Sequence, residues 1–523
     1  MDKLKILIAC PEVVPFAKTG GLADVAGALP KALHVLEHDA RVVMPYYPRA
    51  MPRHTESVPP DGTVLQRVRS MRRQASGHMA IHTVVISSAF AVRVGDNLYT
   101  ARLLEGRFPG TRIPVYFIDA PFFFDRDGLY QENGVDYEDN VERFAFFSKA
   151  ALEGLKTIGW RPDLIHCNEW QTALIPAYLR TTYSEDEFLQ GIATLFAIHN
   201  IGYQGIFPAE KFPLTGLDPS LFSMEGLEFY GNINLLKAGL VLGDILCTVS
   251  PTYSVEIQTQ EFGYGLDGLL RKRRADLYGV LNGIDYSVWN PAVDLHIEKN
   301  YNLNDMSGKV ACKRALQKKL DLPRIDVPLF SVISRLADHK GLDLVAAIMD
   351  RFLDMDIQFV LLGTGDPKYH SVFQEIGRRY PRKTAITIGF DDALAHQIEA
   401  GADVILMPSR YEPCGLNQLY SLRYGTVPIV RRTGGLADSI RDATPVTITT
   451  GDGTGFVFDE PTPEAFLGAI GRAMEAYQDF DTWRKIQLNG MKKDFSWHSA
   501  AREYINLYEK AIRKRRRSDQ PVG

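Results

Sequence analysis

The chain has 523 residues, which is too long for one hydrophobic core and fits two large domains. Its 45% apolar and 23% charged residues are typical of a soluble globular protein, and its net charge of −4 gives no reason to expect nucleic acid or an acidic membrane as a partner. The five cysteines are widely spaced without a C-x-x-C pair, which excludes a zinc-finger pattern and predicts a reduced, cytoplasmic setting. The apolar run at the N-terminus is too short for a signal peptide.

In the first half of the chain, apolar β-branched runs alternate with segments of helical period. This alternation predicts βαβ units and a mainly parallel sheet. The expected strands lie at 5–10, 40–45, 82–87, 115–119, 163–167, 193–200, 245–250 and 278–283. The most hydrophobic stretch, at 235–250, is interrupted by Lys237 and Asp244, so we do not expect it to span a membrane.

The same pattern starts again at 329 and predicts a second doubly wound sheet. Its expected strands lie at 329–334, 358–363, 385–389, 404–409 and 427–432. Turn formers at 282–291 mark the break, which predicts an N-terminal domain at 1–285 and a C-terminal domain at 286–485. The stretch 486–523 reads as a helix that crosses back to the first domain, followed by a basic tail. We interpret the basic run at 513–517 as a solvated helix end and assign it no function.

The hexapeptide Thr-Gly-Gly-Leu-Ala-Asp occurs twice, at 19–24 after Lys18 and at 433–438 after Arg432. Each copy follows an expected strand and opens an expected helix. Paired glycines let backbone amides approach a ligand, and a helix start attracts an anion. The repeat therefore predicts two Rossmann-like domains that face each other across a cleft with a charged ligand between them.

Ligands of doubly wound sheets bind beyond the carboxyl ends of the strands, so polar residues at those positions are the candidates for function. In the second half, Arg335 and Lys340 follow one strand and suit a diphosphate, although surface ion pairing is the structural alternative. Glu412 follows another strand and can accept hydrogen bonds from sugar hydroxyls, or act as a plain turn carboxylate. The glycines Gly363 and Gly365 are a weaker signal, because such turns end many strands.

Three segments of the first half carry further candidates. His199 ends a strand and could contact a sugar hydroxyl or be structural. Glu169 and Trp170 place a carboxylate beside an aromatic ring, which suits a sugar face but also an ordinary core position. Asp139 precedes a helix, where N-capping is the simpler interpretation.

Taken together, these segments resemble the bacterial glycogen and plant starch synthase family, retaining glucosyltransferases of the two-Rossmann architecture called GT-B. The resemblance covers nearly the whole chain, and several ordered motifs are far more specific than a lone glycine-rich loop. The motifs are KTGGLADV from Lys18, DNxxRFAFFSKA from Asp139, HNxxYQG from His199, SPTY from Ser250, NGID…WNP from Asn282, SRLxxxKGLDL from Ser334, PSRYEPCGLNQLY from Pro408 and RRTGGLAD from Arg431.

The resemblance implies transfer of glucose from ADP-glucose to the non-reducing end of an α-1,4-glucan, with retention of configuration and without a metal or other cofactor. It implies catalytic roles for His199, Arg335, Lys340 and Glu412. Residues expected to bind the nucleotide sugar are Lys18, Gly20, Gly21, Gly363, Gly365, Cys414, Gly415, Leu416, Thr433 and Gly434. Residues expected to bind the glucan acceptor are Asp24, Asp139, Glu169, Trp170, Asn200 and Tyr203.

Two positions depart from common patterns. Glu169 stands where the family usually has Asp, and Tyr420 stands where the wider superfamily, but not this family, often has a second Glu. The alternatives are a UDP-glucose-dependent or sucrose synthase-like enzyme of the same fold and a catalytically silent glucan-binding protein. Glycogen phosphorylases share the two-lobed form, but they are considerably longer and carry a cofactor lysine motif that this sequence lacks.

Overall fold

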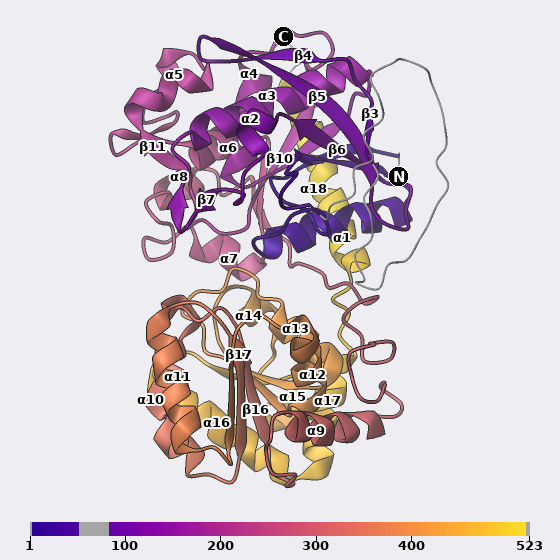
Figure 1. Cartoon of the computed structure of the whole chain (residues 1–523), viewed down its shortest axis with the longest axis vertical. Coiled ribbons are helices and arrows are strands. Elements are labelled where there is room, and N and C mark those ends of the chain that lie inside the picture. The colour runs from indigo at the N-terminus through magenta and orange to yellow at the C-terminus, as the bar shows by residue number, and fades with distance from the viewer. Residues whose placement is uncertain (1–2, 52–82, 519–523) are drawn as a thin grey trace. The chain divides into compact units, whose positions relative to one another are not determined.

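The computed structural model describes residues 3–51 and 83–518, and Figure 1 shows how the chain runs through them. The described residues form two compact units. Unit 1 comprises Met1–Thr248, Ile257–Tyr278 and Ala501–Gly523, and unit 2 comprises Val249–Glu256 and Gly279–Ala500. The expected strand at 82–87 begins outside the described residues, and the fold has β3 (Val84–Val85) there.

The main sheet of unit 1 has the order β15-β14-β10-β9-β1-β2-β6-β5-β3, with β4 paired to β5. From β14 to β6 the pairs are parallel, whereas β5 runs antiparallel to β3, β4 and β6. The strands are β1 (Lys5–Ala9), β2 (Asp39–Pro45), β3, β4 (Phe90–Val94), β5 (Asn97–Arg107), β6 (Pro114–Asp119), β9 (Leu164–Asn168), β10 (Ala193–Ile198), β14 (Ile245–Thr248) and β15 (Leu277–Gly279). The predicted parallel character is confirmed, and the antiparallel pairs of β5 are an addition that the sequence pattern did not indicate.

The helices of unit 1 flank this sheet. They are α1 (Gly21–Val35), α2 (Pro121–Phe124), α3 (Asn140–Ile158), α4 (Leu174–Arg180), α5 (Phe212–Thr215), α6 (Leu235–Leu242), α8 (Asp267–Lys272) and the part of α18 (Trp497–Ser518) that starts at residue 501. Short strands form two small antiparallel pairings, β7 (Gln131–Glu132) with β8 (Val135–Asp136), and β13 (Asn232–Asn234) with β11 (Ile206–Pro208) and β12 (Glu228–Phe229). The yellow α18 lies among the indigo and magenta elements in Figure 1, and Tyr508 on it hydrogen-bonds His166 in the middle of β9 (Nδ1 to hydroxyl, 2.9 Å).

Unit 2 has a wholly parallel sheet of order β18-β17-β16-β19-β20-β21. Its strands are β16 (Leu329–Ile333), β17 (Gln358–Gly363), β18 (Thr384–Ile388), β19 (Val404–Met407), β20 (Val427–Arg431) and β21 (Phe456–Phe458). Its helices are α7 (Pro251–Glu256), α9 (Ser307–Lys319), α10 (Leu342–Leu353), α11 (Pro367–Arg379), α12 (Asp392–Gly401), α13 (Asn417–Tyr424), α14 (Gly434–Ser439), α15 (Pro445–Thr450), α16 (Pro463–Gln478) and α17 (Phe480–Met491). Two doubly wound Rossmann-like sheets are therefore confirmed.

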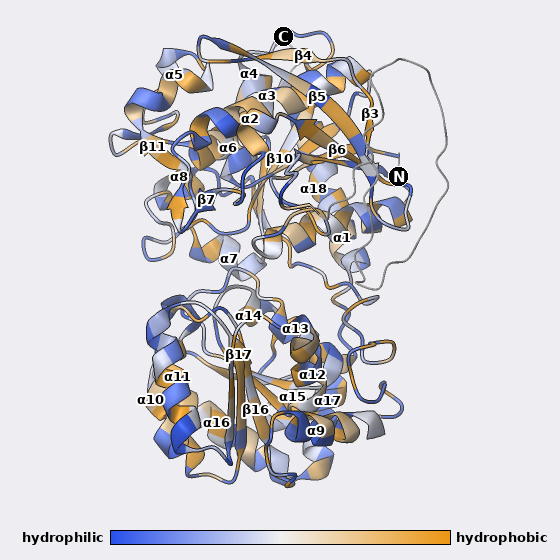
Figure 2. Cartoon of the chain, viewed as in Figure 1, coloured by the Kyte–Doolittle hydropathy of each residue, from blue (hydrophilic) through white to orange (hydrophobic). Residues whose placement is uncertain are grey.

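Burial explains why these segments form a sheet covered by helices. The strands β16 and β17 are nearly all buried, as expected for central parallel strands covered on both faces. Figure 2 shows them in orange, whereas α10 and α11 carry both orange and blue, so that one side faces the core and the other faces water. None of the described helices has the length and apolar character needed to cross a bilayer.

The strand order of each sheet reverses direction once. In unit 1 the chain builds outward from β1 through β2 on one side and from β9 through β10 on the other, so the reversal lies between β1 and β9. In unit 2 it lies between β16 and β19. Connections leave the sheet in opposite directions at such a point and open a crevice beyond the strand ends. The residues that follow β1, β9, β16 and β19 are therefore the ones that the fold offers to a ligand.

Candidate functional site

In unit 2, the segments that follow β16 and β19 lie against each other. The amide of Arg410 donates to the carbonyl of His339 (2.8 Å). Between them, Gly341 adopts a φ of +69°, and a Cβ there would lie 2.1 Å from the carbonyl oxygen of Pro408. Only glycine permits both the left-handed backbone and this approach. Gly341 thus joins two loops that are about seventy residues apart in the sequence.

This junction brings two of the predicted catalytic side chains into direct contact. Lys340 Nζ donates to both carboxylate oxygens of Glu412, at 2.9 and 2.7 Å, and Ser409 Oγ donates to Glu412 Oε2 at 3.0 Å. Glu412 is buried and Lys340 is half-buried. The pair therefore holds opposite charges at the edge of the sheet, partly shielded from water.

The predicted cation Arg335 lies close to this pair. Its side chain is exposed and makes no hydrogen bond or ion pair with any described residue. Burial lowers the pKa of His339, and the positive charges of Lys340 and Arg335 lower it further, opposed by Glu412. Because the charges of Arg335, Lys340 and Glu412 all shift the pKa of His339, we treat these three side chains as one electrostatic cluster.

The start of α13 adds backbone donors to the same region. Residues Cys414, Gly415 and Leu416 precede this helix, whose first amides have no partner within the helix. Burial raises the pKa of the Cys414 thiol to about 12, so the thiol stays protonated and is not a nucleophile at neutral pH. Gly363 is the last residue of β17 and Gly365 follows the strand, and their segment hydrogen-bonds Leu336 on the loop that carries Arg335.

In the second copy of the hexapeptide, a carboxylate of the protein itself accepts the hydrogen bonds that a ligand could otherwise accept. Glu256 Oε1 accepts hydrogen bonds from Thr433 Oγ1 and from the amide of Gly434, both at 3.0 Å. Thr433 and Gly434 are buried, and Gly434 adopts a φ of +42° against the carbonyl of Glu412. The anion that a helix start attracts is thus supplied internally here. A donor-binding role for Thr433 and Gly434 stays a prediction, and it would require Glu256 to give up these bonds.

The first copy of the hexapeptide, in unit 1, remains exposed. Glu12, which follows β1, is buried and accepts hydrogen bonds from the amide and the hydroxyl of Thr19. Burial raises the pKa of Glu12, opposed by these bonds. Lys18 pairs with Asp24 (Nζ to Oδ1, 2.8 Å) and is about half exposed, with Gly20 and Gly21 beside it at the start of α1. Glu12 thus anchors this loop on the side that faces the protein interior, whereas the side that carries Lys18 and Gly21 remains exposed to solvent.

His199 lies at the end of β10, near the reversal point of the unit 1 sheet. Its Nε2 is 2.9 Å from Asn168 Oδ1. The amide group of Asn168 donates to two carbonyls, so its Oδ1 is an acceptor and His199 Nε2 carries the proton. Burial lowers the pKa of His199 to about 4, so the ring is neutral at pH 7. Its Nδ1 is therefore an acceptor, suited to a hydroxyl group and unsuited to protonating a leaving group.

Glu169 holds the loop that carries His199. Its Oε1 accepts the backbone amides of His199 (2.5 Å) and Asn200 (2.9 Å), and its backbone φ of +64° is rare for a residue other than glycine. Burial raises the pKa of Glu169 to about 8, and the two amides oppose this rise. The side chain is thus occupied inside the protein, as a support for His199 and Asn200.

The remaining acceptor candidates differ in exposure. Trp170 is buried, with its ring against Phe144 and Phe207 (centroids 5.0 and 5.7 Å apart), so here it is a core residue. Asp139 precedes α3 without capping it and forms a two-bond ion pair with Arg126. Tyr203 is 58% exposed and is the aromatic ring of this set that is available to a sugar.

Comparison with known proteins shows the family. Residues 5–272 match the family described as starch synthase catalytic domain, and residues 317–488 match glycosyl transferases group 1. The chain is 47% identical to a glycogen synthase of Syntrophotalea carbinolica over 97% of this chain and 99% of that one. It is 46% identical to glycogen synthase 1 of Geobacter metallireducens, over 98% and 97%. The chain belongs to the glycogen and starch synthase family.

Solved structures agree with this assignment. The catalytic domain of starch synthase IV from Arabidopsis thaliana, bound to ADP and acarbose, matches with a TM-score of 0.85 and 32% identity over 98% of this chain and 100% of that chain. A sucrose-phosphate synthase from Thermosynechococcus elongatus matches with a TM-score of 0.55 at 16% identity, which supports the GT-B fold alone. The family and the fold that the motifs implied are confirmed, and the chain is a retaining glycosyltransferase.

For this family member, the structure adds residues that sequence reasoning did not single out. Glu12 and Glu256 each hold one copy of the hexapeptide, and Asn168 fixes the tautomer of His199. Glu12 comes shortly after the first strand, and Asn168 lies beside Glu169, so position after a strand was the available signal. Glu256 gave no such signal, because it lies on a helix far from the repeat in sequence.

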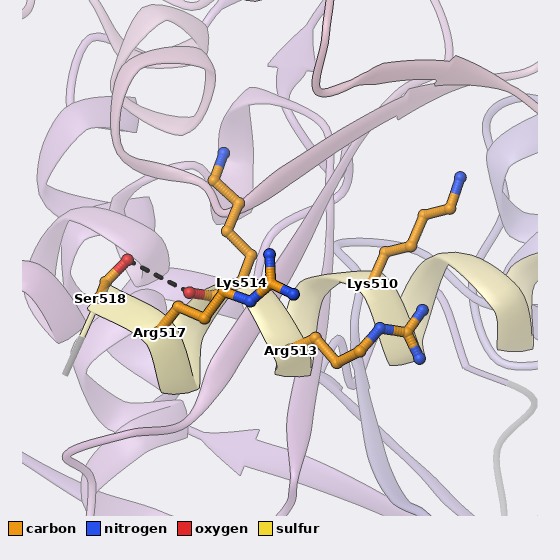
Figure 3. Close-up of a pocket in the computed structure, with 5 residues that line it drawn as sticks. All are labelled: Lys510, Arg513, Lys514, Arg517 and Ser518. Atoms are coloured by element: carbon orange, nitrogen blue, oxygen red, sulfur yellow. Dashed lines mark hydrogen bonds between the residues drawn. The ribbon is translucent and has the colours of Figure 1, made fainter. Parts of the chain in front are cut away.

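A separate hollow of about 420 Å³ lies on the last turns of α18. Figure 3 shows the side chains that line it, Lys510, Arg513, Lys514, Arg517 and Ser518. Lys514 Nζ is paired with Asp276 (2.6 Å) and donates to the carbonyl of Asp244 (2.9 Å). Part of the basic run therefore anchors the helix to unit 1, which refines its interpretation as a solvated helix end.

Proposed function

We propose that this chain is a glycogen synthase that transfers glucose from ADP-glucose to the non-reducing 4-hydroxyl of an α-1,4-glucan with retention of configuration. The observation that carries the proposal is the contact between Lys340 and Glu412 at the reversal point of the unit 2 sheet, beside the exposed Arg335. Its support comes from glycogen synthases at 46–47% identity and from a starch synthase structure that contains ADP.

Each group at this site has a task that its chemistry suits. Arg335 offers a planar fork and Lys340 a compact charge to the diphosphate, which gains negative charge as its bond to glucose breaks. Glu412 accepts hydrogen bonds from the sugar hydroxyls once Lys340 turns to the diphosphate. The amides of Gly415 and Leu416 at the start of α13 add dipole stabilisation for phosphate oxygens.

The groups of unit 1 complete the assignment. Lys18, with the Gly20-Gly21 loop, contacts the diphosphate, and neutral His199 accepts a hydrogen bond from the transferred glucose through Nδ1. Asn200 and the exposed Tyr203 contact the glucan. Glu169 acts through the His199 loop, so we place it among the positioning residues.

No side chain is needed as a nucleophile in this mechanism. The acceptor hydroxyl attacks on the face from which the diphosphate leaves, a new glycosidic bond forms as the old one breaks, and a phosphate oxygen takes the proton. The residues named above supply charge and position, and the reaction as proposed uses no metal or cofactor. Interactions that strengthen as the diphosphate departs raise turnover more than they raise substrate binding.

The five cysteines are free and buried, which supports a reducing cytoplasm as the location of this reaction. The glucan and the nucleotide sugar are the partners we propose, and nucleic acid and membrane are not among them.

A direct test uses the full chain with a short maltooligosaccharide and either ADP-[14C]glucose or UDP-[14C]glucose. We expect labelled, longer glucan with ADP-glucose and little with UDP-glucose. Extension with UDP-glucose alone would overturn the donor assignment. No extension with either donor, together with retained glucan binding, would favour the catalytically silent alternative.

A further inference from the structure

Unit 2 contains a cluster of potential metal ligands that the proposed reaction does not use. His296, Asp392 and His396 each contribute one ligand atom, and these three atoms lie within 4.8 Å of one another. Asp392 and His396 are four residues apart on α12, so they lie on one face of the helix. His296 comes from the segment before α9. It is the one such group among the residues that the structure describes.

A buried carboxylate orients the central histidine. His396 Nδ1 is 2.7 Å from Asp294 Oδ2, and both side chains are about 1% exposed. Tyr424 donates its hydroxyl to the same oxygen (2.5 Å). An ionised carboxylate only accepts, so Nδ1 of His396 carries the proton and Nε2 keeps its lone pair. This arrangement, a carboxylate behind a histidine, fixes the tautomer of histidines that bind metals.

Aromatic stacking holds the same ring in place. Trp289 stacks on His396 with centroids 3.8 Å apart and planes 8° apart, and it also stacks on Tyr420 (3.9 Å and 9°). His296 and Asp392 are exposed, so packing restricts their side chains less than it restricts His396, although the His296 ring lies against the His396 ring (centroids 4.9 Å apart). The cluster therefore combines one rigid ligand with two adjustable ones.

We propose that His296, Asp392 and His396 bind one Zn²⁺ ion, with water as a fourth ligand. Two imidazole nitrogens and a carboxylate oxygen are a common donor set for zinc with three protein ligands. Zinc bonds of about 2.0–2.1 Å place tetrahedral ligand atoms about 3.3 Å apart, which rotation of the two exposed side chains can reach. None of these residues belongs to the donor or acceptor assignments made above.

The ion would join the segment that carries Asp294 and His296 to α12. That segment already contacts the helix through the Asp294–His396 bond and through Gln397, which donates Nε2 to the carbonyl of His296 (2.9 Å). Zinc would thus add a cross-link within unit 2 that does not depend on whether glucose is transferred.

The experiment is titration of metal-free, tag-free full-length protein with ZnCl₂ by isothermal calorimetry, with CoCl₂ as a visible-light probe of four-coordinate geometry. We expect one site per chain. His296→Ala and Asp392→Asn, both at exposed positions, should each weaken zinc binding by about 100-fold or more and remove the cobalt bands, since loss of an outer partner alone costs about 10–100-fold. His34→Ala, at an exposed histidine of unit 1, is the matched control and should bind as the unaltered chain does.

Circular dichroism confirms that each variant is folded before titration. Absence of a site in the unaltered chain would overturn the proposal, and so would full affinity in both ligand variants. Because the readout is metal binding, these results are independent of the donor assays above.

Discussion

Replacing Glu169 by glutamine tests the interpretation of this residue as a buried support for His199. The carboxyl group has a pKa of about 8 in the folded chain, against 4.5 for an ordinary glutamate, with burial as the main cause. Between these two values the folded chain keeps a proton that the unfolded chain has lost. The contribution of Glu169 to the stability of the folded chain is therefore fully present below about pH 4.5 and falls as the pH rises toward 8.

At about 1.36 kcal/mol per pKa unit, this difference corresponds to about 5 kcal/mol of unfolding free energy lost across the window. Glutamine keeps an oxygen that can accept the amides of His199 and Asn200, and it does not titrate. The Glu169→Gln variant should thus match the parent near pH 5 and become more stable than the parent near pH 8, by up to about 5 kcal/mol.

The assay is urea unfolding of both proteins at several pH values from 5 to 8.5, with the difference between them as the measured quantity. Ionisable groups that do not interact with Glu169 contribute equally to both proteins, so their effects cancel in the difference. Glu185→Gln, at an exposed position of unit 1, is the control and should show a constant difference. A stability difference for Glu169→Gln that stays flat across the pH range would refute the reasoning.

Three further predictions concern the site. Lys340→Ala and Arg335→Ala should each lower kcat by about 100-fold or more, because their charges act on the departing diphosphate, and an effect on KM alone would contradict that role. Glu12→Ala leaves the Thr19 amide without its partner, which costs about 1–3 kcal/mol, so we expect KM for the nucleotide sugar to rise about tenfold. Glu12→Gln should keep KM close to that of the unaltered chain, and equal KM values for the two variants would refute the positioning role. Since the pKa of His199 is about 4, its ring stays neutral above pH 5. The pH profile of kcat/KM, measured from pH 5.5 to 8, should therefore have the same shape in His199→Asn as in the unaltered chain. Loss of an inflection near pH 6.5 in the variant would show that the ring titrates.

The sequence predicted the two sheets because buried parallel strands are short apolar runs with turns between them. It also indicated which residues reach the reversal points of the sheets, since the segments after β1, β9, β16 and β19 lie there once the strands pair in order. Lys340 and Glu412 are separated by 72 residues, yet each was identified by its place after a strand.

What the sequence could not indicate depends on side chains that meet only in three dimensions. The two hexapeptides are identical, but one is exposed and the other is closed by Glu256, which lies 177 residues before Thr433. Trp170 beside Glu169 has the composition of a sugar platform, and only its burial against Phe144 shows a core role. The pairing of Asp139 with Arg126 likewise replaces the expected cap.

The division of α18 has a consequence for how the protein is made. Unit 1 begins at the N-terminus, but its last element comes from residues after 500. Unit 2, apart from Val249–Glu256, is the continuous stretch Gly279–Ala500. Buried side chains of α18, including Tyr504 and Tyr508, cover part of unit 1. During translation, all of unit 2 has been synthesised before α18 is complete, so unit 2 can fold before unit 1 has its last helix. A fragment that stops at Tyr278 would leave an apolar surface bare, and adding α18 as a separate peptide should rescue its solubility.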